Sequence, residues 1–249
     1  AEHREYAPGD DLRYVDWNVY ARLDRIMLKQ FTSEDRIQVH LLLDRSASMD
    51  AAPAKRETAL RMAAAFGYLA LAGGDRLRLV ELHGGLAEGG VAWSGLRQIR
   101  ALFDRLENTE FSGPCRLSES CAAWVRSAPV GGLAVVVSDF LEPEAGVPGL
   151  QALRGRDFDV LAVRVEAQEE REPVLRGSVR LRDSESGELR DLTIGEAELQ
   201  RYAELREAHR VAVSQFASSS GSDLLDVPTD ADIVELLLAD DGQVLVGEM

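Results

Sequence analysis

Short apolar runs of strand length and longer stretches with helical spacing alternate along most of the chain. Residues 37–43 and 133–137 are nearly continuous apolar runs, and residues 76–83 alternate between apolar and polar side chains. Such runs, bounded by glycine, proline or short polar residues, are typical of strands. The strands predicted in this way are residues 26–31, 37–43, 76–83, 91–93, 133–137, 158–165 and 224–227.

Between these strands, apolar side chains recur every three or four positions, as they do on one face of a helix. Pro53 can occupy the first turn of a helix, and Gly73-Gly74 can end it. The predicted helices are residues 53–72, 96–106, 116–127, 150–154, 196–216 and 232–238. Because strands and helices alternate, we predict an α/β fold with a doubly wound, mostly parallel sheet and helices on both faces.

Three segments fall outside this alternation. Residues 1–35 are polar and irregular, and we expect them to form an N-terminal arm that packs on the main domain, residues 36–249. Strand-like segments flank a turn-forming Asp-Ser-Glu-Ser-Gly, so residues 173–195 are predicted to be a hairpin insertion at the edge of the sheet. The charged run at residues 166–172 is interpreted as a solvated loop.

Composition and charge narrow the class of protein. The net charge of −15 argues against a generic nucleic-acid binder, which needs a basic surface, and suits a cation site or a basic protein partner. The cysteines, Cys115 and Cys121, form no CxxC pair, and no apolar stretch approaches the roughly 18 residues of a membrane helix. We therefore expect a cytoplasmic protein, and we expect further sequence before Ala1.

Oxygen-bearing side chains follow two of the predicted strands. Asp44, Ser46 and Ser48 come at every second position where the first central strand ends, and Ser138-Asp139 ends a later one. In open α/β sheets this carboxyl edge is where ligands bind. A site with one or two carboxylates, completed by hydroxyls and water, suits magnesium. We predict a site for Mg²⁺ or another divalent cation that leaves one coordination position for a partner's acidic residue.

Enzyme motifs are missing from the sequence. It has no GxGxxG after a strand, no GxxxxGK[ST] phosphate loop, no GxSxG elbow and no HExxH pair. A phosphatase of the haloacid dehalogenase type needs a second Asp where this chain has Ser46. We therefore expect no enzymatic activity. A magnesium-dependent phosphate-ester hydrolase using Asp44 and Asp139 stays open as the alternative, and the serines could simply cap the following helix.

The Asp44-x-Ser46-x-Ser48 spacing, with Asp139 after a later strand, resembles the metal-ion-dependent adhesion site of von Willebrand factor type A domains. Residues 6–17 (Tyr-Ala-Pro-Gly-Asp-Asp-Leu-Arg-Tyr-Val-Asp-Trp) resemble the signature of one bacterial branch, the domain-of-unknown-function 58 (DUF58) family. Further matching segments are Ala21-Arg22, Lys29-Gln30-Phe31, Glu34, Ser138-Asp139-Phe140 and Asp183-x-Glu185-x-Gly187-Glu188. This resemblance implies a von Willebrand factor A-like fold and an adaptor or co-chaperone of a MoxR-type AAA+ ATPase.

One position departs from the adhesion-site pattern. Such sites take a third hydroxyl, usually from Thr, and the matching stretch at residues 112–117 puts Cys115 there. A thiol is a soft ligand and a poor partner for magnesium. Three interpretations stay open: Thr109 or Ser112 replaces the missing hydroxyl, the site binds metal weakly, or the protein is a scaffold with a degenerate site.

The charged residues of the arm also have two interpretations. They are Asp10, Asp11, Arg13, Asp16 and Arg22. Structurally, their ion pairs would hold the arm against the sheet. Functionally, they would form a surface that the ATPase recognises.

Overall fold

The computed structural model describes residues 2–5, 27–30, 36–114, 116–129 and 131–239 of the chain. The chain divides into two compact units, Ala1–Arg36 and Ile37–Met249. In the first, β1 (Glu2–Glu5) pairs antiparallel with β2 (Met27–Gln30), so the predicted strand at residues 26–31 has a partner that the sequence pattern did not indicate. The charged cluster at residues 10–22 lies outside the described residues, and the packing of the arm stays a prediction.

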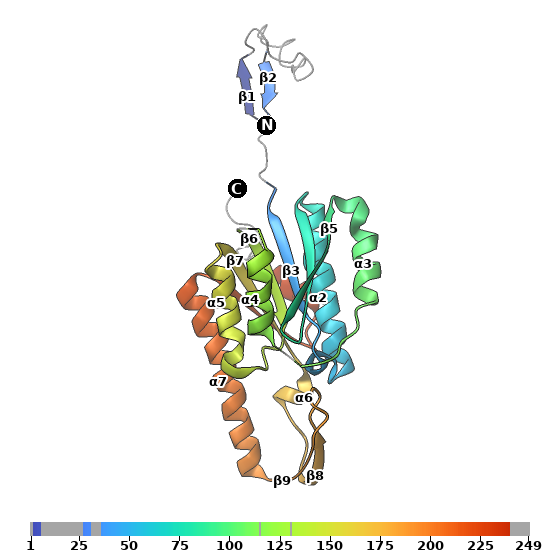
Figure 1. Cartoon of the computed structure of the whole chain (residues 1–249), viewed down its shortest axis with the longest axis vertical. Coiled ribbons are helices and arrows are strands. Elements are labelled where there is room, and N and C mark those ends of the chain that lie inside the picture. The colour runs from blue at the N-terminus through green and yellow to red at the C-terminus, as the bar shows by residue number, and fades with distance from the viewer. Residues whose placement is uncertain (1, 6–26, 31–35, 115, 130, 240–249) are drawn as a thin grey trace. The chain divides into compact units, whose positions relative to one another are not determined.

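The second unit is built on a six-stranded sheet (Figure 1). Its order is β10-β7-β6-β3-β4-β5, and every neighbouring pair is parallel except β4 and β5. The strands are β3 (Gln38–Asp44), β4 (Arg76–His83), β5 (Leu86–Ser94), β6 (Gly132–Ser138), β7 (Phe158–Glu166) and β10 (Asp223–Pro228).

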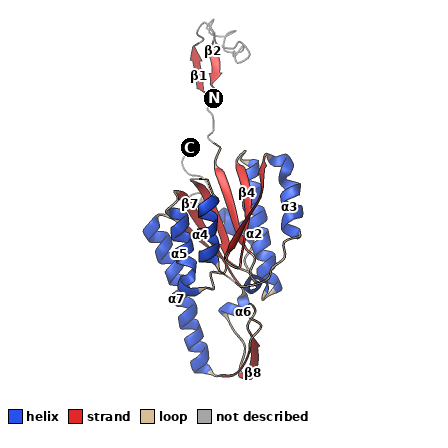
Figure 2. Cartoon of the chain, in the orientation of Figure 1, coloured by secondary structure: helices blue, strands red, loops and turns tan. Residues whose placement is uncertain are grey.

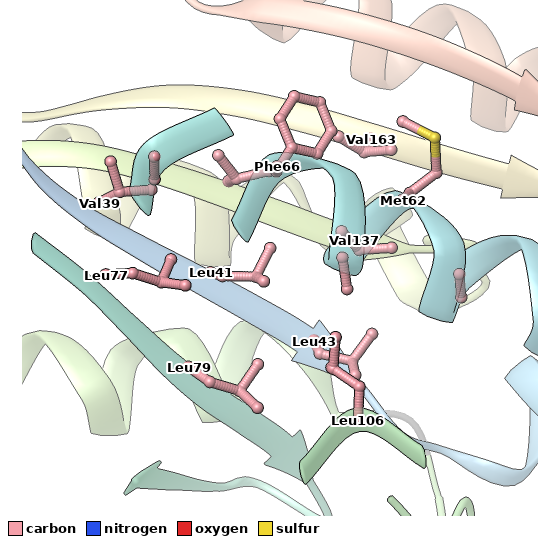
Figure 3. Close-up of a cluster of buried hydrophobic side chains, with 14 of the residues drawn as sticks. Val39, Leu41, Leu43, Met62, Phe66, Leu77, Leu79, Leu106, Val137 and Val163 are labelled. Atoms are coloured by element: carbon pink, nitrogen blue, oxygen red, sulfur yellow. The ribbon is translucent and has the colours of Figure 1, made fainter. Parts of the chain in front are cut away.

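Helices cover both faces of this sheet (Figure 2). On one face, α2 (Pro53–Ala72), α3 (Ile99–Glu107) and α8 (Ile233–Ala239) pack on alternate strand residues such as Leu41 and Leu43 (Figure 3). On the other, α4 (Leu117–Ser127), α5 (Val147–Arg154) and α7 (Glu196–Ser220) pack on residues such as Leu42. The buried residues are mostly aliphatic, as expected for strands covered on both sides. The predicted fold class is confirmed.

Some element boundaries differ from the prediction. β5 begins five residues earlier than predicted and returns beside β4, because Gly84 and Gly85 take the left-handed backbone of a tight hairpin turn. Short 3₁₀ turns also appear at Ala47–Asp50, Leu96–Gln98 and Pro143–Gly146.

The hairpin insertion was placed wrongly at the edge of the main sheet. β8 (Gly177–Arg182) and β9 (Leu189–Ile194) form a separate two-stranded sheet. The hairpin follows β7, whose two sides are already paired with β6 and β10, so no free edge is available there. Together with α6 (Gln168–Arg171) and the first half of α7, it extends beyond the carboxyl ends of the strands (Figure 1).

Candidate functional site

The ends of β3 and β6 bring the first group of predicted site residues together. The strands are parallel neighbours in which Leu43 pairs with Val137, so the residues that follow lie side by side. The Ser138 hydroxyl donates a hydrogen bond to Asp44 Oδ2 at 2.6 Å, and the Ser46 backbone N–H donates to Asp44 Oδ1 at 2.9 Å. The Asp44 carboxylate is thus held by two hydrogen bonds at the carboxyl edge of the sheet.

The two serines of the motif form a buried pair beside this carboxylate. Their Oγ atoms are 3.0 Å apart, and Ser46 is fully buried while Ser48 is nearly so. The loop that carries the third-hydroxyl position is attached to the same segment, because Ala47 N–H donates to the Gly113 carbonyl and Ser112 N–H donates to the Arg45 carbonyl.

Of the three candidate positions for the third ligand, Thr109 and Ser112 lie in the described residues. Cys115 lies outside the described residues. The Thr109 hydroxyl donates to Glu81 Oε1 on β4 at 3.1 Å, so it is engaged with a different carboxylate. Ser112 is exposed, and the bond to Arg45 uses its backbone N–H.

Asp139 is bound by a group that the sequence analysis missed. Its Oδ2 accepts a hydrogen bond from the Lys55 ammonium at 2.7 Å, and its Oδ1 accepts one from Leu141 N–H at 3.0 Å. Lys55 lies in the first turn of α2 and is fully buried, and its ammonium also donates to Glu170 Oε1 at 2.6 Å. A resident positive charge therefore joins the strand-end carboxylate to α6.

Two signals in the sequence point to Lys55 in retrospect. The chain holds 28 Lys and Arg residues, yet lysine occurs only at positions 29 and 55. A lysine ammonium is a compact point charge on a flexible stem, which suits a narrow space between two carboxylates better than the planar fork of arginine. Glu170 was hidden in a charge run interpreted as a solvated loop; for this residue that interpretation was wrong, because its carboxylate is bound by the buried ammonium.

Burial and neighbouring charges shift the pKa values of two members of the cluster, Asp44 and Lys55. Burial and the neighbouring Asp139 charge raise the pKa of Asp44 to about 6, although hydrogen bonds from Ser138 and Ser46 oppose the shift. Burial lowers the pKa of Lys55, but its ion pairs with Asp139 and Glu170 outweigh burial and leave that pKa raised. The Lys55 ammonium is shared by two carboxylates, Asp139 and Glu170, and the Asp139 charge also acts on Asp44.

The donor atoms fit a hard cation held by few protein ligands. Within the described part of the chain, no three His, Cys, Asp or Glu side chains are grouped so that they could hold a metal ion. The donor set that remains is Asp44, Ser46, Ser48 and Asp139, with one Asp139 oxygen shared with Lys55. Hard oxygens completed by water are the environment that magnesium prefers. Of the donor residues, Asp44 bonds to Ser46 and Ser46 to Ser48, and Asp139 is near enough for its charge to act on Asp44.

Among the described residues, His40 and Cys121 are both held in the core and are not available for nucleophilic catalysis at this cluster. His40 lies in the core, where its ring contacts Trp124 and Phe158. Burial raises the pKa of the Cys121 thiol, so it stays protonated and unreactive. The motif serines hydrogen-bond to each other, and the Ser46 side chain also bonds to the Asp44 carboxylate; no histidine lies beside them in the described contacts.

Comparison with known proteins assigns the chain to a family. A family model described as "Protein of unknown function DUF58" matches residues 2–212. The uncharacterized proteins Rv1480 of Mycobacterium tuberculosis (strain H37Rv) and Mb1516 of Mycobacterium bovis are each 33% identical over 238 residues, covering 93% of this chain and 74% of theirs.

Solved structures share the fold at low sequence identity. The pilus adhesin SpaC from Lactobacillus rhamnosus GG is 12% identical with a TM-score of 0.50, over 85% of this chain and 30% of that one. The conserved hypothetical protein BatB from Bacteroides thetaiotaomicron is 16% identical with a TM-score of 0.49, over 82% and 95%. A von Willebrand factor type A protein from Catenulispora acidiphila is 15% identical with a TM-score of 0.39, over 71% and 42%. Such similarity concerns the fold alone.

No helix in the described residues combines the length and apolar character needed to cross a membrane.

Proposed function

The chain belongs to the DUF58 family, and we propose that it is a non-enzymatic protein-interaction module whose contact face is the carboxyl edge of its sheet. The observation that carries this proposal is the buried cluster at the strand ends, where the Lys55 ammonium joins Asp139 to Glu170 and the Asp139 charge acts on Asp44. The described residues there present fixed charge and hydrogen-bond acceptors, and the Ser138 and Ser46 hydroxyls hold the Asp44 carboxylate in place. Charged groups fixed in this way favour recognition of a charged partner.

We propose further that Asp44, Ser46, Ser48 and Asp139 hold a magnesium ion. The support is the hard-oxygen donor set and the position of Asp44, whose pKa is raised by burial and by the neighbouring Asp139 charge. A bound ion would supply a positive charge with a coordination position open to a carboxylate of the partner. The shared Asp139 oxygen leads us to expect weak binding, because Lys55 already neutralises part of that carboxylate.

The proposed partner is a MoxR-type AAA+ ATPase, with this protein acting as its adaptor or co-chaperone. The family resemblance supports this assignment, and the negative cluster on the contact face is compatible with it.

Magnesium binding and partner binding are tested with one pair of variants. Asp44→Asn removes a proposed ligand, whereas Asp50→Asn changes an exposed carboxylate in the same 3₁₀ turn region and serves as the matched control. In calorimetric titration with MgCl₂, heat of binding should be present in the wild type and in Asp50→Asn, and absent in Asp44→Asn.

The same two variants are then compared in binding to the purified MoxR-type ATPase of the same organism, with and without EDTA. Asp44→Asn and EDTA should each weaken the complex about tenfold or more, while Asp50→Asn should leave it unchanged. Equal binding by all three proteins would contradict the proposed contact face. Hydrolysis of p-nitrophenyl phosphate that disappears in Asp44→Asn would replace the adaptor with the hydrolase.

A further inference from the structure

A cavity of about 520 Å³ opens between the β8–β9 hairpin, the start of α7 and the segment around α6. Its walls are mainly apolar and come from parts of the chain outside the main sheet. They include Leu175, Leu181, Leu192, Ile194, Leu199 and Tyr202. A volume of this size is within the range of sites that bind small molecules or anchoring side chains.

Several apolar side chains at this cavity or next to it are left in water. Leu192, Leu175 and Tyr202 are exposed although they line it, and the adjacent Val174 is 87% exposed. The two-stranded β8–β9 sheet belongs to neither core cluster of the main sheet. Apolar surface gathered in a concave place, instead of scattered singly, marks a binding surface.

The charge around the cavity specifies what would bind there. Among the described residues, its lining includes three glutamates, Glu169, Glu170 and Glu198, and no Lys, Arg or His. Of the hairpin arginines, Arg180 is paired with Asp191 at 2.6 Å and Arg190 with Glu188 at 3.2 Å, and neither Arg176 nor Arg182 belongs to the lining. The fully buried Lys55 ammonium is already paired with Glu170, so Glu169 and Glu198 are the lining carboxylates that remain for an outside cation. The occupant therefore needs both an apolar group and positive charge.

A second copy of this chain does not meet that requirement. The chain carries a net charge of −15, so two copies would bring acidic surfaces together at an acidic rim. A basic segment of another protein avoids this repulsion.

We propose that this cavity binds a segment of a partner protein in which a large apolar side chain is flanked by Lys or Arg. The apolar side chain enters between Leu181, Leu192 and Tyr202, and the flanking cations face Glu169 and Glu198. This contact is separate from the proposed magnesium ligands and needs no metal ion. Glu170, which belongs to the lining and also binds Lys55, places the cavity directly beside the metal-site carboxylates.

The test is selection of a displayed library of random twelve-residue peptides on the whole chain, with EDTA present throughout. EDTA removes any metal-bridged contact, so failure here is distinguishable from failure of the proposed magnesium site. Enriched peptides should contain Leu, Ile, Phe or Met next to Lys or Arg. One such peptide, labelled with fluorescein, is then titrated against protein variants.

Two matched pairs of variants locate the binding. Leu192→Ser removes a lining residue that is 47% exposed, and Leu189→Ser changes a non-lining residue of the same strand that is 59% exposed. Losing a leucine that the bound peptide would cover should weaken peptide binding about tenfold, and the control variant should leave the affinity unchanged. Likewise, Glu169→Arg should weaken binding, whereas Glu172→Arg, outside the lining, should change it much less.

Four results would overturn the proposal. They are a library without enrichment, enrichment of acidic peptides, equal binding by Leu192→Ser and Leu189→Ser, and a dimer that Leu192→Ser dissociates in sedimentation. The last would assign the cavity to a second copy of the chain.

Discussion

Replacing Lys55 with methionine removes the buried ammonium that the structure places between Asp139 and Glu170. Methionine keeps an unbranched side chain of similar length, so the apolar part of the packing is largely preserved. Charge compensation is lost instead. The Asp139 side chain is only 2% exposed and would keep an uncompensated charge, whereas the Glu170 side chain is 25% exposed and can recover water.

The expected cost follows from this geometry. Removing one partner of a buried ion pair costs about 3–5 kcal/mol, because the other charge stays desolvated. Because water can solvate Glu170 in the variant, the cost should lie at the lower end of this range. We therefore expect the free energy of unfolding to fall by about 3 kcal/mol. For a protein of this size, that corresponds to a decrease in Tm of roughly 6–12 °C.

The assay is urea unfolding followed by circular dichroism, with Arg61→Met as the matched control. Arg61 lies on the same helix and pairs with Glu57, but both side chains are exposed, so its loss should cost less than about 1 kcal/mol. In Lys55→Met combined with Asp139→Asn, the uncompensated charge is removed, and part of the stability should return. Equal stability losses in Lys55→Met and Arg61→Met would refute the buried ion pair.

Two further predictions concern the core. His40 is buried with neither ring nitrogen hydrogen-bonded within the described residues, and burial together with the charge of Arg78 lowers its pKa to about 4. As the pH falls, the unfolded chain binds a proton at His40 before the folded chain does. The stabilisation from neutral His40 should therefore be complete above pH 6.5, and the free energy of unfolding should fall by about 3 kcal/mol between pH 6.5 and pH 4. In urea unfolding at several pH values, His40→Leu should remove this part of the pH dependence, and an unchanged dependence would contradict the prediction. A Cβ at Gly149 would lie 2.8 Å from the Ser118 backbone, so Gly149→Ala should lower stability by about 1–3 kcal/mol in thermal melts despite the better helix propensity of alanine, and a higher Tm would show that α4 and α5 pack less closely.

The sequence predicted those parts of the site that depend on strand ends. Asp44 and Ser138 follow apolar runs that could only be buried parallel strands, and neighbouring parallel strands finish at the same edge. Their proximity could therefore be inferred without coordinates. The hairpin turn that makes β5 antiparallel was missed because its glycines read as a loop.

The sequence could not predict the partners of Asp139 in the same way. Lys55 lies 84 residues from Asp139 and 115 from Glu170, and in sequence a lysine near a helix start and a glutamate in a charge run look like solvated residues. Only the packing of α2 and α6 at the strand ends makes them a buried ion pair. The cavity was missed for a related reason, because the hairpin was assigned to an edge of the main sheet that it does not join.

The central claim is that the carboxyl edge of the sheet, around Asp44 and Asp139, is the face that contacts the partner. Hydrogen–deuterium exchange of the chain alone and with the MoxR-type ATPase tests it most directly. We predict slower exchange in the complex over residues 44–50, 139–142 and 167–172. Slower exchange confined to the opposite edge of the sheet, around Gly73-Gly74 and residues 128–132, would contradict it.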